Sequence, residues 1–224
     1  YKVVDVLTTL PILFAGLLLP LLSSYWSLQD RGSFSRLVQQ GFDAMCVLAW
    51  PIMIGTLFVG EDLMALIAGE QFRASGLILQ LLVWASGIIF FNAVFSHAII
   101  ALNRQKETIF AYAITAIVGV AGYFIFIPKF GALGAAAMTI ATEGLVALLV
   151  FSAYVRFSGL RPSIRRWLPI AFSCLGMALA LWLADDYSFF VRLGLSIVVY
   201  GGLMLLTGGI SKPFMRELLT LKKS

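Results

Sequence analysis

Charge is scarce in this chain, and so are the residues that usually catalyse reactions or bind metals. Only 12% of the 224 residues are charged, and the chain has one histidine and two cysteines. Cys46 and Cys174 lie in apolar stretches, and neither has a second ligand at a metal-site spacing. We therefore expect buried thiols, no metal site and no catalytic residue.

The shortage of charge also excludes two broad classes of protein. Hydrophobic residues make up 61% of the chain, more than a soluble domain of this size can bury, whereas a bilayer accommodates them. The net charge of +5 forms no basic patch among polar faces, which argues against a nucleic-acid partner.

The first apolar stretch is not a signal peptide, because it contains Asp5 and lacks a basic start.

Seven apolar stretches are long enough to cross a bilayer, which takes about 20 residues. The predicted spans are 3–24, 42–60, 77–101, 109–127, 132–155, 168–184 and 189–209, the sixth being short. The fourth and fifth are joined by a tight turn at 128–131, PKFG. The sequence thus predicts an all-α, polytopic membrane helix bundle.

Residues 29–42 show a different pattern from the spans around them. Phe34, Leu37, Val38 and Phe42 share one helical face, and arginines and glutamines occupy the opposite face. Such a helix is typical of the membrane–water interface. We expect a short interfacial helix here, feeding the second span.

Lys and Arg residues gather in every second gap between the predicted spans. One set of gaps holds twelve: Arg31, Arg36, Arg104, Lys106, Arg156, Arg161, Arg165, Arg166, Lys212, Arg216, Lys222 and Lys223. The other set holds four: Lys2, Arg73, Lys129 and Arg192. By the positive-inside rule the first set faces the cytoplasm. Residues 156–167 are then a basic cytoplasmic loop, and 168–224 comprise two further spans and a basic cytoplasmic tail.

The same rule places the first residue near the outer face. A polytopic chain whose first span starts outside is expected to have lost an odd number of preceding spans. The chain also opens with Tyr1 rather than Met. We therefore expect this sequence to be the later part of a longer protein.

Four stretches resemble a known transporter family: TTLPILFAGLLLPLLSSYW, LIAGEQFRASGLILQLL, ALNRQK and IPKFGALGAAAMTIATEG. They are similar to the C-terminal half of the polysaccharide-transporter (Wzx-type) oligosaccharide flippases, within the multidrug/oligosaccharidyl-lipid/polysaccharide exporter superfamily. The resemblance covers most of residues 1–155 and implies spans eight to twelve of a 14-helix, two-lobed exporter whose N-terminal lobe is missing. In one departure, Gly119, Ala121 and Gly122 occupy the region where relatives commonly place an Asn.

The resemblance implies flipping of undecaprenyl-diphosphate-linked oligosaccharide units across the bacterial inner membrane, for O-antigen, capsule or exopolysaccharide synthesis. The implied partners are the bilayer, the lipid-linked oligosaccharide, the missing lobe and polysaccharide polymerase machinery. No cofactor is expected beyond a proton or sodium gradient. A multidrug exporter or a lipid II flippase of the same superfamily remains open. A membrane-embedded O-antigen polymerase or ligase is disfavoured, because the longest outer loop, 61–76, has no histidine.

Ionisable groups inside a membrane are costly, so each one is a candidate site residue. Glu143 lies near the middle of 132–155, with Thr139 and Thr142 on the adjacent face. It is either a cavity carboxylate that binds a coupling cation or a neutral group at a helix–helix contact. Asp5, which begins the first span, is a further candidate near the outer face, where solvation also accounts for it.

The third span and the loop after it supply the remaining candidates. His97 is either a proton relay or a hydrogen-bonded packing residue. Asn92 and Ser96 could bind sugar hydroxyls or join helices by hydrogen bonds. Arg104 and Lys106, at the predicted inner mouth, could grip the diphosphate of the substrate or serve only to set topology.

Overall fold

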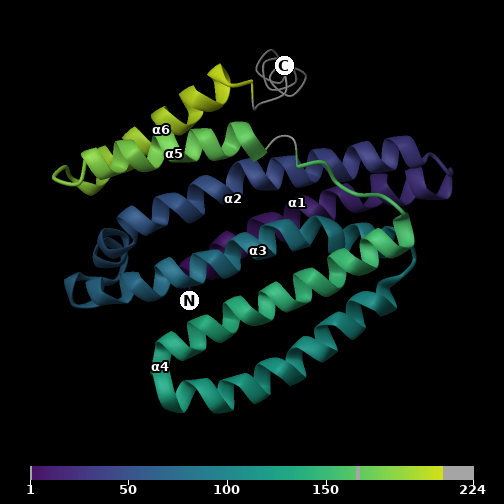
Figure 1. Cartoon of the computed structure of the whole chain (residues 1–224), viewed down its shortest axis with the longest axis horizontal. Coiled ribbons are helices and arrows are strands. Elements are labelled where there is room, and N and C mark those ends of the chain that lie inside the picture. Colours follow the sequence, from purple (N-terminus) through teal and green to yellow (C-terminus); the bar gives the residue numbers. More distant parts are fainter. Residues whose placement is uncertain (1, 165–166, 209–224) are drawn as a thin grey trace.

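The computed structural model describes residues 2–164 and 167–208, with side chains from residue 6 onward, and every regular element in those ranges is helical. The order is α1 (Lys2–Ser27), α2 (Arg31–Ala68), the 3-10 helix η1 (Glu70–Ser75), α3 (Gly76–Ala101), α4 (Gln105–Ser158), α5 (Trp167–Leu183) and α6 (Phe189–Leu206). Figure 1 shows them lying lengthwise side by side. The predicted all-α class is confirmed. Tyr1, Arg165, Arg166 and the predicted tail from residue 209 lie outside the described residues.

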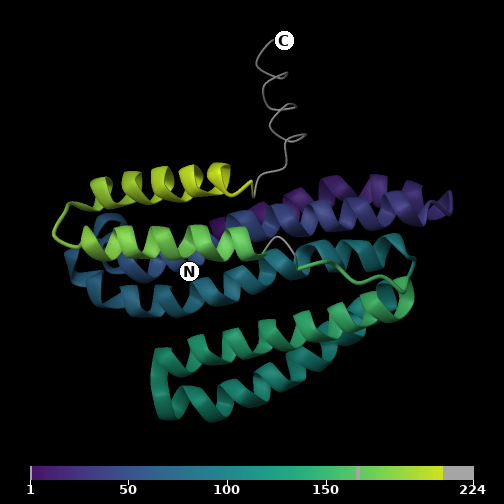
Figure 2. The ribbon, with the colours of Figure 1, turned by 45° about the horizontal axis from the view of Figure 1, so that its top comes forward.

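The predicted spans correspond to these helices, and two of them share α4. Length and composition would allow five described helical segments to cross a bilayer, and α5, with 17 residues, is shorter. A straight helix of 54 residues would be about 80 Å long. The chain instead reverses at Gly131, where φ is 57° and ψ is −134°. Figures 1 and 2 show the two arms of α4 running back along each other, so the predicted turn at 128–131 is confirmed.

The helix predicted at 29–42 is not a separate element. Its residues form the first turns of α2, which continues unbroken to Ala68. Phe34, Val38 and Phe42 are buried in the protein core, and the Phe34 ring lies 5.2 Å from that of Trp26 on α1. An amphipathic pattern does not distinguish a helix that lies on a membrane from one that packs on other helices.

The alternate gaps lie at opposite ends of the bundle. The α1–α2 and α3–α4 connections and the end of α4 are at one end, and the α2–α3 connection, the α4 turn and the α5–α6 turn are at the other, in both Figures 1 and 2. Of the residues assigned to the cytoplasm, those that the structure describes lie toward the first end: Arg31, Arg36, Arg104, Lys106, Arg156 and Arg161. The chain therefore has the up-and-down topology that its charge pattern predicts.

The core is built on α2 and α3, with α4 packing on α3 and α5 packing on α2, and aromatic rings join these helices. Phe95 of α3 lies 5.3 Å from Phe42 of α2 and 5.1 Å from Tyr154 of α4, between ring centroids. Trp167 of α5 lies 6.3 Å from Phe42. Cys46 and Cys174 are buried, free thiols, as expected. This packing joins α5 to the helices that precede it in the chain.

Replacing Gly131 by alanine is expected to destabilise the α4 hairpin by about 1–3 kcal/mol, because its positive φ is unfavourable for a residue with a Cβ. No atom lies within 4 Å of that Cβ position, so the substitution tests backbone strain alone. Gly144→Ala is the matched control, since Gly144 is helical and has equally open surroundings. The two free energies of unfolding are compared in SDS titrations of purified protein; equal values would contradict the prediction.

The stability of the first turn of α2 is expected to depend on pH through the ionisation of Asp30. Hydrogen bonding from the Ser33 side chain, together with the Ser33 N–H that donates to the Asp30 carboxylate at 3.0 Å, holds the pKa of Asp30 below its usual value. The cap is therefore fully formed above the usual pKa and is lost as the pH falls through the lowered pKa. Hydrogen exchange at the Ser33 amide should show this loss, whereas Asp30→Asn should cap without the pH dependence.

Candidate functional site

A line of polar side chains joins the two arms of the α4 hairpin within the predicted spans. The Tyr123 hydroxyl on the first arm lies 3.1 Å from the Thr139 hydroxyl on the second. Thr139 donates to the Ala135 carbonyl at 2.9 Å, and Thr142 donates to the Met138 carbonyl at 2.9 Å. The sequence identified both threonines but missed Tyr123. Its position one residue after Gly122, on the face where the arms meet, was the available signal.

Glu143 continues this line one turn beyond Thr139. It is half-buried, and no hydrogen bond or ion pair from any described residue reaches its carboxyl group. The neighbouring threonines bond to backbone carbonyls instead. A half-buried carboxyl without a protein partner is available to a cation or a proton.

Small residues on the first arm allow the two arms to approach closely. A Cβ on Gly119 would lie 3.1 Å from Cγ2 of Thr142, and one on Gly122 would overlap the Met138 side chain. The space beside Gly119 and Gly122 is therefore filled from the opposite arm. The two arms pack there through the Thr142 methyl group and the Met138 thioether. The polar contact between the arms is made by Tyr123 instead.

The candidates on α3 form a second, separate polar group. Asn92 and Ser96 are buried, and the Ser96 hydroxyl donates to Oδ1 of Asn92 at 3.4 Å. His97 is half-buried, with its Nδ1 2.8 Å from the Ala93 carbonyl, the contact expected of a tautomer protonated at Nδ1. In the described part of the chain, no hydrogen bond joins this group to Glu143.

At the basic end, two arginines share one aromatic ring. The guanidinium carbon of Arg104, at the start of α4, lies 4.7 Å from the centre of the Phe157 ring, and that of Arg156 lies 5.6 Å from it. Arg104 therefore lies beside a second cation, which makes this end attractive to anions. Lys106 is exposed to solvent. The side chain of Asp5 is outside the described residues.

An ion-pair network at the opposite end was missed by the sequence analysis. The Arg192 guanidinium is buried and pairs with Asp62 and, at 3.0 Å, with Asp185. Asp62 also binds Arg73 at 2.5 Å, and Arg73 binds Glu70 at 2.6 Å. Through its hydrogen bond, Arg73 lowers the pKa of Glu70. The network fastens the α5–α6 turn to the end of α2.

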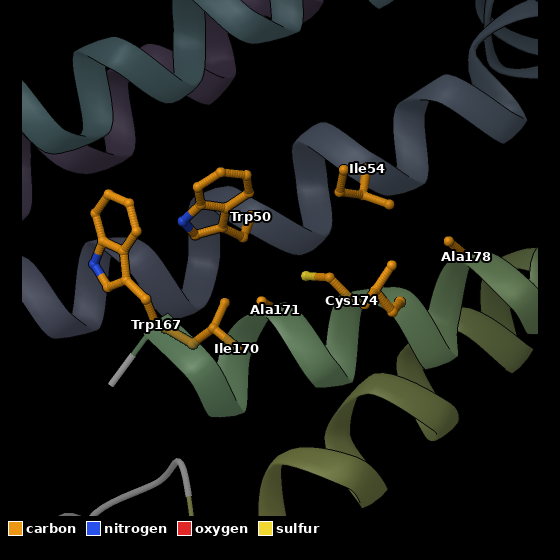
Figure 3. A pocket seen from close by; sticks show the side chains of 8 residues that line it. Trp50, Ile54, Trp167, Ile170, Ala171, Cys174 and Ala178 are labelled. Atoms are coloured by element: carbon orange, nitrogen blue, oxygen red, sulfur yellow. The ribbon is translucent and has the colours of Figure 1, made fainter. Parts of the chain in front are cut away.

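An apolar pocket of about 330 Å³ lies between α2 and α5 (Figure 3). Its lining residues are Trp50, Ile54, Trp167, Ile170, Ala171, Cys174, Leu175 and Ala178. No carboxylate, histidine or cation lines it, so it offers no acid–base chemistry. Its shape and chemistry suit a segment of an apolar chain.

Comparison with known proteins gives a fold and no family. No family model matches the chain, and no curated protein matches it. A solved structure titled "Lipid II flippase MurJ, inward closed conformation" matches 94% of this chain with a TM-score of 0.72 and 21% sequence identity. The match covers 45% of that chain, so this sequence spans about half of its length.

This likeness establishes the architecture of the chain. The chain has an all-helical fold that it shares with the matched part of that flippase structure. At 21% identity the likeness does not select the Wzx-type branch. The match also does not say which part of a longer exporter this chain would be, so its assignment to spans eight to twelve stays a prediction.

Proposed function

We propose that this chain is one lobe of a transporter that flips a lipid-linked saccharide across the bacterial inner membrane. The observation that carries the proposal is the shared fold, which extends over 94% of this chain and 45% of a lipid II flippase. The segregated charges and the polar line on α4 agree with a transporter, because an exporter needs both a fixed topology and polar groups within the bilayer.

In the proposed mechanism this lobe rocks against a second lobe around a hydrated cavity. The sugar-diphosphate headgroup travels in the cavity while the polyprenyl tail remains in lipid. Arg104, held with Arg156 on the Phe157 ring, supplies positive charge at the proposed cytoplasmic mouth, where a diphosphate is loaded. Glu143, whose carboxyl has no described partner, is the proposed group that binds the coupling proton or sodium ion.

Two cargoes are supported by different observations. The sequence resemblance favours undecaprenyl-diphosphate-linked repeat units of O-antigen, capsule or exopolysaccharide, and the fold match favours lipid II. Complementation separates them, with the full-length gene placed in one strain lacking its repeat-unit flippase and in another depleted of its lipid II flippase. Rescue of surface polysaccharide in the first strain alone supports the repeat unit, and rescue of growth in the second supports lipid II.

Rescue of neither strain, with the protein stably expressed, would count against a lipid-linked cargo. The same-fold alternative is then a multidrug exporter, which energy-dependent efflux of a fluorescent cation would reveal. Transport is favoured over a polymerase or ligase because the protein with the matching fold is a flippase.

A further inference from the structure

An open pocket of about 400 Å³ lies at the basic end of α4, on the outside of the bundle. Arg156 lines it from the last turns of α4, and Arg161 lines it from the loop that follows. Phe151, Ser152 and Val155 complete the lining, so no acidic side chain belongs to it. Both arginines are exposed, and no carboxylate in the described residues pairs with either.

The loop that carries Arg161 is held in place on both sides. Gly159 turns the chain with a φ of 71°, and the Leu160 N–H donates to the Ser158 hydroxyl at 3.0 Å. Beyond Arg161, the Ser163 N–H donates to Oε1 of Gln39 at 2.7 Å, and Nε2 of Gln39 donates to the Ser163 carbonyl at 2.9 Å. Because the loop is already ordered, binding at Arg161 has a smaller entropic cost.

Electrostatics at this pocket favours an anion. The C-terminus of a helix carries a partial charge of about −0.5, which opposes anion binding. Arg156 and Arg161 contribute two full positive charges, and Arg104 adds a third beside Phe157. The positive charges outweigh the helix end, and guanidinium groups bind phosphate oxygens bidentately.

The other side of the pocket is apolar and continues along the helix. Phe151 packs edge-on against Phe95 at 5.1 Å, yet 36% of its surface remains exposed. Leu148, one turn earlier on the same side of α4, is 66% exposed. A ligand with phosphate next to hydrocarbon would satisfy both sides of the pocket, whereas a free anion would use only the arginines.

We propose that this pocket binds the phosphodiester headgroup of an anionic glycerophospholipid, with an acyl chain lying along Phe151 and Leu148. Basic pockets at the cytoplasmic side of membrane helices bind such headgroups. The site adjoins the proposed cytoplasmic mouth, because Arg156 shares the Phe157 ring with Arg104, but it does not depend on the cargo.

The test is the dissociation constant for dioleoyl phosphatidylglycerol, measured by native mass spectrometry on the detergent-solubilised full chain. The double variant Arg156→Gln/Arg161→Gln should bind this lipid roughly 30-fold more weakly. Ser152→Glu places a carboxylate in the pocket and should also weaken binding of this lipid. The matched control, Arg36→Gln/Lys106→Gln, removes two exposed charges at the same end and should change the constant by less than about threefold.

Each arm of the experiment separates the proposal from an alternative. An equal loss in the control and pocket variants would overturn it, because general surface charge would then explain the binding. Displacement of the lipid by millimolar inorganic phosphate would overturn the lipid assignment in favour of a free-phosphate site. Dioleoyl phosphatidylcholine, which has the same chains without net charge, should bind all variants weakly; binding it as tightly as phosphatidylglycerol would also overturn the proposal.

Discussion

Asp62→Ala is expected to lower the free energy of unfolding by about 3–5 kcal/mol, because it leaves the buried Arg192 guanidinium without its main partner. The Arg192 side chain is only 7% exposed, so water cannot replace the lost carboxylate. The remaining partner, Asp185, is 80% exposed and compensates weakly. The measurement is an SDS unfolding titration of the purified protein.

The same network supplies the control variants for this measurement. Asp185→Ala removes an exposed partner of the same guanidinium and should cost less than about 1 kcal/mol. Adding Arg192→Met to Asp62→Ala should restore most of the loss, because no buried charge then remains unpaired. Equal effects of Asp62→Ala and Asp185→Ala would show that Arg192 is not buried as described.

Glu143→Gln is expected to reduce transport by about tenfold or more while leaving the unfolding free energy nearly unchanged. Glutamine keeps the size of the side chain, but its amide is uncharged and does not take up or release a proton near neutral pH. Since no described residue bonds to the Glu143 carboxyl, the substitution removes no protein–protein contact. The measurement is the initial export rate of the lipid-linked saccharide at matched expression of the full-length protein.

Glu107→Gln is the control for Glu143→Gln, because Glu107 lies in the first turn of α4, at the basic end and outside the predicted spans. The Glu107→Gln variant should transport at the rate of the native protein. Unchanged transport in Glu143→Gln would contradict the proposed coupling role and favour a packing role for the α4 hairpin. A loss of both transport and stability would also contradict it, because it would reveal an unrecognised structural contact.

Helices could be predicted where the sequence signal lies within one short stretch of the chain. Apolar stretches of about 20 residues were recognisable because a bilayer sets that length, and Pro128 and Gly131 marked the reversal inside α4. The boundary of the helix at 29–42 could not be predicted for a related reason. Its apolar face is real, but the sequence does not say whether lipid headgroups or the rings of neighbouring helices cover it.

The contacts that the sequence did not reveal join distant residues. Asp62 lies in the predicted outer loop 61–76 and Arg192 belongs to a different outer gap, far away in the chain. Their pairing depends on how the α5–α6 turn packs on α2, which periodicity does not encode. Tyr123 was missed similarly, because its hydrogen bond to Thr139 exists only once the two arms of α4 close on each other.

The central claim is that this chain is part of a lipid-linked saccharide flippase. It is tested most directly by the fraction of undecaprenyl-diphosphate-linked saccharide accessible at the outer leaflet, in cells that lack their own flippase and express the full-length gene. We expect the accessible fraction to rise with expression of the native protein and to fall again with Glu143→Gln. An accessible fraction that stays at the level of the empty strain, with stable protein in the membrane, would contradict it.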